Sequence, residues 1–351
     1  MSRGVADTFA LTSDSGRAPA RDPAPGLRQD WRPVAQRSTL EARAAMLARL
    51  RAYFDSSGVL EVDTPILSSA AATDPVLASL ATRISGARGD GGLPFYMQTS
   101  PELAMKRLLA ADVGSIYQIC KVFRGQERGR LHHPEFSLLE WYRTGWDHHR
   151  LMDEVAEVVR AALDRPEMPA ERLTYQELFQ QALGVDPWRA SADDLAAAAL
   201  RAGIPDATRL ELDKNGWLDL LLTQRLESRL GQDGMTFVYD YPSTQAALAR
   251  VRDGQCPAAE RFELYIRGVE LANGFHELAD PAEQRQRFQS DLERRRALGL
   301  EQPPVDNRFL AALEAGLPDC SGVALGIDRL LMIAVGADHI DAVLSFPVER
   351  A

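Results

Sequence analysis

Apolar side chains recur at helical spacing near the start of the chain, and this pattern predicts the first long helix. Between residues 38 and 56, one helical stripe is apolar at Leu40, Ala44, Leu47 and Leu50. Ser38 or Thr39 is suited to cap this helix at its N-terminus, and Gly58 ends it. The residues at 59–65 then predict a strand that closes at a proline.

Two runs rich in β-branched and aromatic residues, 116–123 and 136–142, predict an antiparallel hairpin. The loop between them is built from glycine, arginine, histidine and proline residues. Side chains alternate between the faces of a strand. One face of the first run should therefore carry Gln118, Cys120, Val122 and Arg124. One face of the second run should carry Phe136, Leu138, Glu140 and Tyr142.

The remaining pattern predicts a mixture of helices and strands around this hairpin. In chain order it gives a strand at 94–99, a mainly helical segment at about 148–230, a strand at 236–242, one long strand bent at Gly268 over 262–271, a polar helix at 281–299, a strand at 322–326 and a helix at 328–335. Helices placed between mostly antiparallel strands predict an α+β fold with an antiparallel sheet flanked by helices. Residues 1–28 are predicted to be a disordered leader before one catalytic domain at 29–351.

Composition narrows the possible functions of this chain. Its 351 residues carry a formal net charge of -10, which argues against broad binding to nucleic acid through phosphate neutralisation. No run approaches the roughly 20 apolar residues of a membrane span, and the N-terminus lacks the pattern of a secretory signal. A cytoplasmic protein without a membrane partner is therefore expected. The three cysteines are widely spaced and predict neither a disulfide framework nor a zinc site.

Two arginines are candidates for phosphate chemistry. Arg124 follows the first strand of the predicted hairpin, and Arg329 lies at the start of a helix after the glycine-rich strand 322–326. A planar guanidinium binds two phosphate oxygens and stabilises charge that develops on phosphorus. Taken alone, each arginine is better explained as a surface residue paired with a carboxylate, such as Asp328 beside Arg329. The two blocks together, in this order, favour phosphate binding, although the chain has no Gly-Lys-Ser/Thr phosphate loop.

Two glutamates, Glu270 and Glu277, flank the residues 271–276, which include a predicted Asn-Gly turn and precede the glycine-rich block. Carboxylates in such a pair are suited to hold Mg²⁺ against polyphosphate oxygens. One of them is also suited to bind the ammonium group of a substrate. The alternative is a solvated pair of glutamates without a ligand, which the neighbouring motifs make less favourable.

Other polar residues have a structural explanation beside a functional one. Ser100, Pro101 and Glu102 form a good helix start, but Glu102 also suits a ligand amine. His132 and His133 lie in the hairpin loop, where contact with a nucleotide or phosphate is favoured over simple exposure. His148 and His149 open a helical region and are predicted to lie on the surface.

These blocks resemble the class II aminoacyl-tRNA synthetases from about Trp31 to Ala351. The likeness is strongest to lysyl-tRNA synthetases, and stronger still to the family of their truncated paralogues that attach (R)-β-lysine to elongation factor P. Residues 132–142, 270–277 and 318–329 carry it most specifically. The resemblance implies a homodimer that uses ATP and Mg²⁺ to make an aminoacyl adenylate, and then transfers the acyl group to an amine or hydroxyl.

The resemblance also implies a role for individual residues. Arg124 would hold the α-phosphate and Arg329 the γ-phosphate as the catalytic residues. Further ATP contacts would come from Gln126, His133, Glu270, Leu271 and Gly326. The amino-acid pocket would be formed by Ser100, Pro101, Glu102, Tyr142, Glu277 and Ala324, and Mg²⁺ would be held by Glu270 and Glu277. Two positions depart from the family pattern, since Gln126 stands where glutamate is usual and His133 where asparagine is usual.

Three features favour the paralogues over the tRNA-charging synthetases. The predicted leader is too short for the barrel that reads an anticodon, and the chain ends soon after the third motif, so tRNA is not expected as a partner. Ala324 stands where lysyl-tRNA synthetases have glycine, and Ser100 stands where they usually have alanine. The methyl of Ala324 would narrow the pocket near the α-carbon and leave room for a β-amino acid.

The expected function is therefore ATP-dependent activation of (R)-β-lysine and its transfer to the ε-amino group of one lysine on elongation factor P. The first alternative is a truncated lysyl-tRNA synthetase-like enzyme that acylates tRNA or another acceptor. The second is a non-catalytic paralogue that senses an amino acid or nucleotide. Retention of both phosphate arginines and both glutamates argues against the second alternative.

Overall fold

The computed structural model describes residues 31–84, 93–204, 207 and 209–351. The leader predicted at 1–28 lies outside the described residues. Within the described part of the chain, no helix is both long and apolar enough to cross a bilayer.

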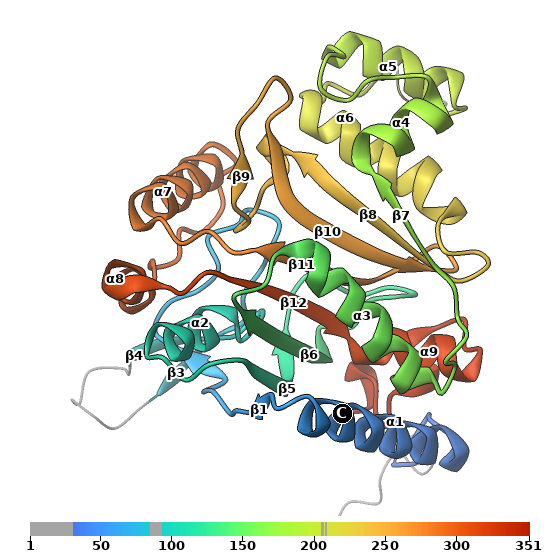
Figure 1. Ribbon diagram of the computed structural model, residues 1–351, viewed down its shortest axis with the longest axis vertical. Coiled ribbons are helices and arrows are strands. Elements are labelled where there is room, and N and C mark those ends of the chain that lie inside the picture. The colour runs from blue at the N-terminus through green and yellow to red at the C-terminus, as the bar shows by residue number, and fades with distance from the viewer. Residues whose placement is uncertain (1–30, 85–92, 205–206, 208) are drawn as a thin grey trace, which may run out of the picture.

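A twisted sheet forms the centre of the molecule (Figure 1). Its strands follow the order β1 (Leu60–Glu61), β5 (Ile116–Phe123), β6 (Glu135–Thr144), β12 (Cys320–Gly326), β11 (Val269–His276), β10 (Ala258–Ile266), β8 (Met235–Pro242) and β7 (Ala170–Thr174). From β5 to β8 every neighbouring pair is antiparallel, whereas β1 and β7 add parallel edges. The predicted hairpin is β5 and β6.

Smaller strands and the helices surround this sheet. β9 (Val251–Arg252) pairs with β10, and β2 (Leu67–Ser68), β4 (Leu93–Met97) and β3 (Ala81–Ile84) form a separate small sheet. The α-helices are α1 (Arg37–Ser56), α2 (Glu102–Ala110), α3 (His148–Leu163), α4 (Tyr175–Leu183), α5 (Ala192–Arg201), α6 (Lys214–Leu221), α7 (Pro281–Ala297), α8 (Asn307–Gly316) and α9 (Ile327–Val335). An antiparallel sheet flanked by helices is the predicted α+β fold, and that prediction is confirmed.

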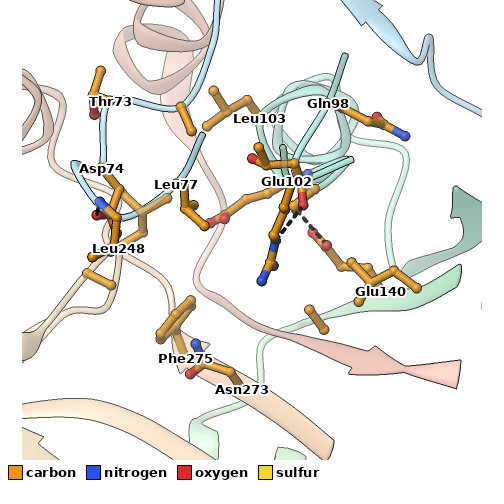
Figure 2. Close-up of a pocket in the computed structure, with 18 of the residues that line it drawn as sticks. Thr73, Asp74, Leu77, Gln98, Glu102, Leu103, Glu140, Leu248, Asn273 and Phe275 are labelled. Atoms are coloured by element: carbon orange, nitrogen blue, oxygen red, sulfur yellow. Dashed lines mark hydrogen bonds between the residues drawn. The ribbon is translucent and has the colours of Figure 1, made fainter. Parts of the chain in front are cut away.

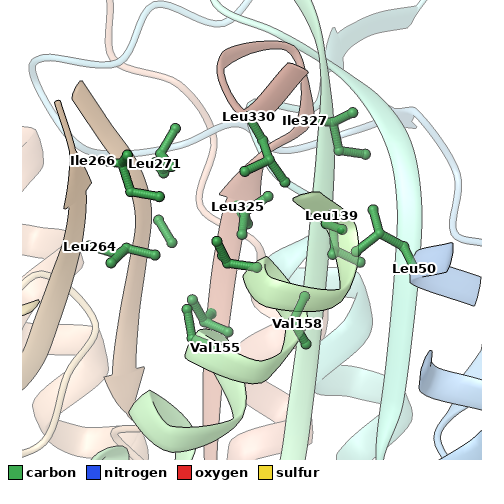
Figure 3. Packing of buried hydrophobic residues seen from close by; sticks show 14 of the residues in the cluster. Leu50, Leu139, Val155, Val158, Leu264, Ile266, Leu271, Leu325, Ile327 and Leu330 are labelled. Atoms are coloured by element: carbon green, nitrogen blue, oxygen red, sulfur yellow. The ribbon is translucent and has the colours of Figure 1, made fainter. Parts of the chain in front are cut away.

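One face of the sheet is covered by α1, α3 and α9, which enclose the main core. In Figure 3, Val155 and Val158 of α3 pack toward Leu325 of β12 and Leu139 of β6. The predicted alternation along β6 accounts for this division. Leu139 faces this core, and Glu140 faces the opposite side, where a cavity lies. The core side holds the sheet rigid, and the other side is left for chemistry.

Residues 148–230 contribute to two different cores. Helix α3 packs in the main core, whereas α4, α5 and α6 build a second cluster against β8 and β10. Figure 1 shows these three helices together beside β7 and β8. A π-helical turn, Leu222–Leu226, follows α6. The segment is mostly helical but also contains the edge strand β7.

The predicted long bent strand at 262–271 is wrong. The structure has two strands there, β10 and β11, joined by a turn at Arg267 and Gly268. Both residues have positive φ angles, 51° and 70°, which is the backbone of a tight hairpin turn. The apolar character of both strands hid this turn, because Arg267 is not a typical turn residue.

Two predicted boundaries at the first helix also differ. Helix α1 begins at Arg37 after Gln36, and no side chain caps it, so neither Ser38 nor Thr39 is the cap. The strand predicted at 59–65 is limited to Leu60–Glu61. Only these two residues pair with β5, and the residues after Glu61 leave the sheet.

Candidate active site

A cavity of about 1070 Å³ opens on the sheet face opposite the main core. Its floor comes from β6, β11 and β12, and its walls include the start of α2 and the loop after β5. Figure 2 shows Glu102 and Glu140 on one side of this cavity and Asn273 and Phe275 on the strand below. The predicted face of β6 is confirmed, since Phe136, Leu138, Glu140 and Tyr142 all line the cavity.

A β-bulge brings the two predicted glutamates to the same side of β11. Residues 270 and 277 are an odd number apart and would face opposite sides of a regular strand. In the structure Leu264 pairs with Ala272 and Tyr265 with Glu270, so Leu271 is an extra residue without a partner opposite it. This bulge shifts the alternation by one position. Glu270 and Glu277 therefore both line the cavity.

Arg329 is anchored by backbone oxygens at one end of the cavity. Its guanidinium donates to the carbonyl of Glu270 at 2.8 Å and to that of Leu131 at 3.1 Å. It also approaches Nε2 of His132 at 2.7 Å. Burial and the charge of Arg329 lower the pKa of His132, which favours the neutral ring that accepts this hydrogen bond. Asp328 instead pairs with Arg43 of α1, whereas Arg329 lies 3.6 Å from Glu270.

Arg124 lies near this end of the cavity and stacks over the ring of Phe136, 5.1 Å from its centroid. Its Nη1 is 3.3 Å from Oε1 of Glu127. Glu127 lines the cavity, whereas Gln126 is exposed and is not among the lining residues. The carboxylate beside Arg124 is thus supplied one position later than the resemblance implied.

The other residues with implied ATP contacts are also near Arg329. Leu271 and Gly326 line the cavity, and a Cβ at Gly326 would lie 3.9 Å from the side chain of Arg329. His133 is buried, and its Nε2 accepts a hydrogen bond from the amide of Val348 at 2.9 Å. His133 therefore ties the loop to the C-terminal segment as well as lining the cavity.

The opposite end of the cavity contains a buried cation between two carboxylates. Nζ of Lys106, on α2, lies 2.6 Å from Oε1 of Glu102 and 2.6 Å from Oε2 of Glu277. Burial alone would lower the pKa of Lys106, but the charges of Glu102 and Glu277 outweigh it and raise the pKa. Burial also raises the pKa of Glu277 to about 7, although Lys106 opposes this shift. The ion pair fixes α2 to the end of β11.

Glu140 is a third acidic group at this end of the cavity. It is 2% exposed and accepts hydrogen bonds from the hydroxyls of Ser100 and Tyr142, both at 2.7 Å. Burial, followed by the charge of Glu102, raises the pKa of Glu140 to about 8. The Ser100 hydroxyl also accepts from the amide of Glu102, so it both starts α2 and orients Glu140. This carboxylate is positioned to pair with a cationic ligand.

Two small residues of β12 set the shape of this end. A Cβ on Gly322 would overlap the ring of Tyr142 and come within 2.5 Å of Oε1 of Glu277, so only glycine fits there. Ala324 pairs with Asn273 on one side and Glu140 on the other. Its methyl group therefore projects into the cavity between two polar side chains.

A family model described as tRNA synthetases class II (D, K and N) matches residues 29–350. The chain belongs to the class II tRNA synthetase family. Its antiparallel sheet, with the glycine-rich strand β12 leading into Arg329, agrees with this membership. The class II resemblance predicted from the two arginine blocks is thereby confirmed.

Several curated class II relatives match nearly the whole chain. A Vibrio atlanticus protein named elongation factor P--(R)-beta-lysine ligase is 48% identical over 325 residues, which cover 93% of this chain and 100% of the relative. A Klebsiella pneumoniae (strain 342) protein of the same name is 48% identical over 321 residues, covering 92% and 98%. One from Salmonella arizonae is 47% identical over 321 residues, covering 92% and 98%.

Sequence reasoning about this class II chain misses residues that the cavity brings together. Strand alternation places Glu140 on the correct face of β6 but gives it no role, and the helical pattern treats Lys106 only as part of a helix. Asn273 and Phe275 also line the cavity, alternating with Glu277 along β11. Alternate residues of a strand share a face, so counting back from Glu277 by twos would have pointed to Phe275 and Asn273. No local signal marks Lys106, because its partner Glu277 is 171 positions away (277 − 106).

The carboxylates of this class II site differ in how well they suit Mg²⁺. Mg²⁺ is usually held by one or two carboxylates together with substrate phosphates. Glu270 is half exposed, faces the cavity and lies 3.6 Å from Arg329, where phosphate charge would be placed. Glu277 is buried and already paired with Lys106, which favours a role toward a substrate amine.

Proposed function

We propose that this protein uses ATP to activate (R)-β-lysine as an adenylate and transfers the acyl group to the ε-amino group of a lysine on elongation factor P. The observation that carries the proposal is the polarity of the cavity. Arg329 lies beside Gly326 at the end of β12, whereas Glu277 lies beside Gly322, near the start of the same strand. Glu102 shares Lys106 with Glu277, so these carboxylates are separated from Arg329 along β12. An adenylate of a diamino acid has its phosphate at one end and its two ammonium groups at the other, which matches the arginines and the carboxylates of the cavity. The printed names of the relatives support the same substrate and acceptor.

In the first step, a carboxylate oxygen of (R)-β-lysine attacks the α-phosphorus of ATP, and pyrophosphate leaves. Arg124 stabilises the negative charge that builds on the α-phosphate, and Arg329 binds the γ-phosphate. Glu270 would hold Mg²⁺, which would neutralise further charge on the phosphates. The proposal also includes ATP contacts from Gly326, Leu271, His133 and Gln126. It further includes a role for Glu277 in holding Mg²⁺.

In the second step, the acceptor amine attacks the acyl carbon of the adenylate, AMP leaves, and the amine nitrogen loses a proton. The acidic end holds the substrate in place during this step. Glu140, oriented by Ser100 and Tyr142, binds one ammonium group, and Glu277 and Glu102 accept the other beside Lys106. Positioning and charge stabilisation are sufficient for this chemistry without a dedicated base.

The preference for a β-amino acid is assigned to Ala324 together with Ser100, and Pro101 is proposed only to line the amino-acid pocket. A methyl group placed against a substrate changes its relative affinity by about 1–3 kcal/mol. Because Ala324 lies between Asn273 and Glu140, its methyl group occupies space that an α-amino group would need. A β-amino group lies one carbon further from the carboxylate.

The proposal also includes a cytoplasmic homodimer that does not charge tRNA. Leu60 on the edge strand β1 and Ile66 beside it are 56% and 40% exposed, and such apolar side chains are suited to a subunit interface. Light scattering of the purified protein tests this part independently of activity. A mass of about 39 kDa would contradict the dimer, because one chain weighs 38.7 kDa.

The decisive experiment is ATP–pyrophosphate exchange with (R)-β-lysine and L-lysine side by side. Exchange that favours (R)-β-lysine, followed by a mass increase of elongation factor P, is the expected result. Exchange with L-lysine alone, together with acylation of tRNA, would instead identify a synthetase-like enzyme. No exchange with either amino acid would contradict the proposal.

A further inference from the structure

Behind the cavity, on the other face of the sheet, three side chains with metal-binding atoms converge. Within the described residues, His148, Glu260 and His276 form the only such group of three, and one ligand atom from each lies within 4.8 Å of the others. All three are buried, at 2%, 5% and 3% exposure. They come from the start of α3, from β10 and from the end of β11.

The position of this cluster follows from strand alternation. Glu277 lines the cavity, so its neighbour His276 points to the opposite face of β11. On β10, Arg261 lines the cavity, and Glu260 next to it points the same way as His276. The cluster therefore shares two strands with the proposed active site but is buried on the other face of the sheet.

The backbone is irregular where these side chains meet. Ala259 pairs with Tyr241 and Phe262 pairs with Tyr239, so Glu260 and Arg261 together oppose the single residue Asp240. Asp240 has a φ angle of 58°, a left-handed conformation that is strained for most residues. Bulges of this type redirect side chains and are frequent near functional sites. Here the bulge aims Glu260 at the two histidines.

His148 has no hydrogen-bond partner for either ring nitrogen among the residues that the structure describes. The sequence prediction that this histidine lies on the surface is wrong, because it is 2% exposed. Its Nε2 lies 3.6 Å from Oδ1 of Asp240, an oxygen that is likewise without a partner in the described part of the chain. Buried polar atoms without partners cost free energy, so these atoms are suited to an additional ligand.

His276 is held in the orientation that a metal ligand needs. Its Nε2 is 2.7 Å from Oδ1 of Asp319, and this contact orients the other nitrogen, Nδ1, toward the cluster. Nδ1 lies 2.9 Å from Oε2 of Glu260. A carboxylate that binds the outer nitrogen of a histidine is the usual support for a metal-binding imidazole.

The charges around the cluster also permit a cation. Arg250 is 2.7 Å from Glu260, and Arg252 is 2.7 Å from Asp240. These two guanidinium groups face the carboxylates of Glu260, Asp240 and Asp319, so carboxylates outnumber arginines around the cluster. His149 lies beside His148, with ring centroids 4.1 Å apart.

We propose that His148, Glu260 and His276 bind one divalent transition-metal ion of the zinc type. Two imidazoles and one carboxylate form a ligand set that Zn²⁺ commonly uses, with a further position open to water or to Asp240. The site joins the start of α3 to β10 and β11. Because His276 precedes Glu277, a bound ion would stabilise the strand end that carries Glu277 and its ion pair with Lys106.

The test measures Zn²⁺ binding to the full-length protein by titration with a competing chromophoric chelator, without ATP. The expected result is one equivalent of bound Zn²⁺ in the wild type. The equivalent is lost in His148→Gln and in Glu260→Gln, and Asp319→Asn weakens binding about 10–100-fold, the usual effect of removing an outer carboxylate. Absence of a bound equivalent in the wild type would overturn the proposal.

Two control variants distinguish this site from metal binding elsewhere on the protein. His149→Gln removes the neighbouring histidine outside the three-residue group and should keep the equivalent. Glu270→Gln removes a carboxylate in the cavity and should also keep it, whereas loss in this variant alone would assign the ion to the active site. Zn²⁺ should raise the melting temperature of the wild type but not that of His148→Gln. An equal rise in both would contradict the site even if one variant folds poorly.

Discussion

The two ends of the cavity are built in different ways. At the phosphate end, Arg329 and Arg124 remain partly exposed and are held mainly by backbone oxygens and by nearby loop residues. At the amine end, Lys106, Glu277 and Glu140 are almost fully buried. Lys106 and Glu277 pair with each other, and Glu140 is held by Ser100 and Tyr142. Charges at the first end are therefore available to a ligand at little cost, whereas each charge at the second end depends on its partners.

The first prediction tests whether the phosphate end acts on catalysis alone. Arg329→Ala should lower the rate of ATP–pyrophosphate exchange on the order of 10³-fold, because it removes the positive charge proposed to bind the γ-phosphate of the leaving pyrophosphate, and arginines that stabilise phosphate charge contribute at least about this much. Its melting temperature should change little. Exchange kinetics and thermal melts measure both effects. Arg130→Ala is the control, since Arg130 is an exposed arginine of the β5–β6 loop outside the cavity.

The second prediction tests whether the amine end also holds the fold together. Lys106→Met should lower the free energy of unfolding by about 3–5 kcal/mol, because it leaves the buried Glu277 without its cation and removes the partner of the partly buried Glu102. Urea denaturation measures this change. Lys121→Met removes an exposed lysine 3.4 Å from Glu135 and should cost less than about 1 kcal/mol. Equal effects in the two variants would remove the proposed difference between the ends.

The same difference explains what sequence alone predicts. The phosphate end lies in short, local blocks, so the amino-acid sequence alone is enough to propose Arg124, Arg329 and Glu270 as candidates. The amine end depends on contacts between α2, β6 and β11, and only strand alternation pointed to Glu140. The hairpin turn after β10 and the bulge in β11 are not predictable in this way, because both depend on pairing between strands and not on local composition. The burial of His148 escaped prediction because it comes from the docking of α3 on the sheet.

The third prediction concerns Glu140. Replacing it with glutamine should lower activity but raise stability at high pH relative to the wild type. Glu140→Gln should lower kcat/KM for the amino acid about 10–200-fold, the effect expected for losing a charged hydrogen bond. The pKa of Glu140, raised to about 8 mainly by burial, means that the folded state keeps a proton that the unfolded chain loses near pH 4.3. Between about pH 4 and pH 8, Glu140 ionises in the unfolded chain but stays protonated in the folded protein. The free energy of unfolding therefore falls as the pH rises through this range.

Because a glutamine side chain does not ionise, the stability of Glu140→Gln relative to the wild type should increase between about pH 5 and pH 9. Urea denaturation at both pH values measures this difference. Glu135→Gln is the control, since Glu135 is exposed at the start of the same strand and has no such environment. A relative stability of Glu140→Gln that does not rise with pH would show that Glu140 is ionised at low cost in the folded state.

The smallest effect is expected at Ala324, where the two ends meet the substrate carbon chain. Ala324→Gly removes the methyl group between Asn273 and Glu140. The ratio of kcat/KM for L-lysine to that for (R)-β-lysine should rise about 5–150-fold, which corresponds to the 1–3 kcal/mol of one methyl contact. Pyrophosphate exchange with each amino acid measures the ratio. Ala258→Gly, which removes a buried methyl group from β10 outside the cavity, should leave it unchanged. If both variants altered the ratio equally, strand flexibility and not the shape of the amine end would determine the preference.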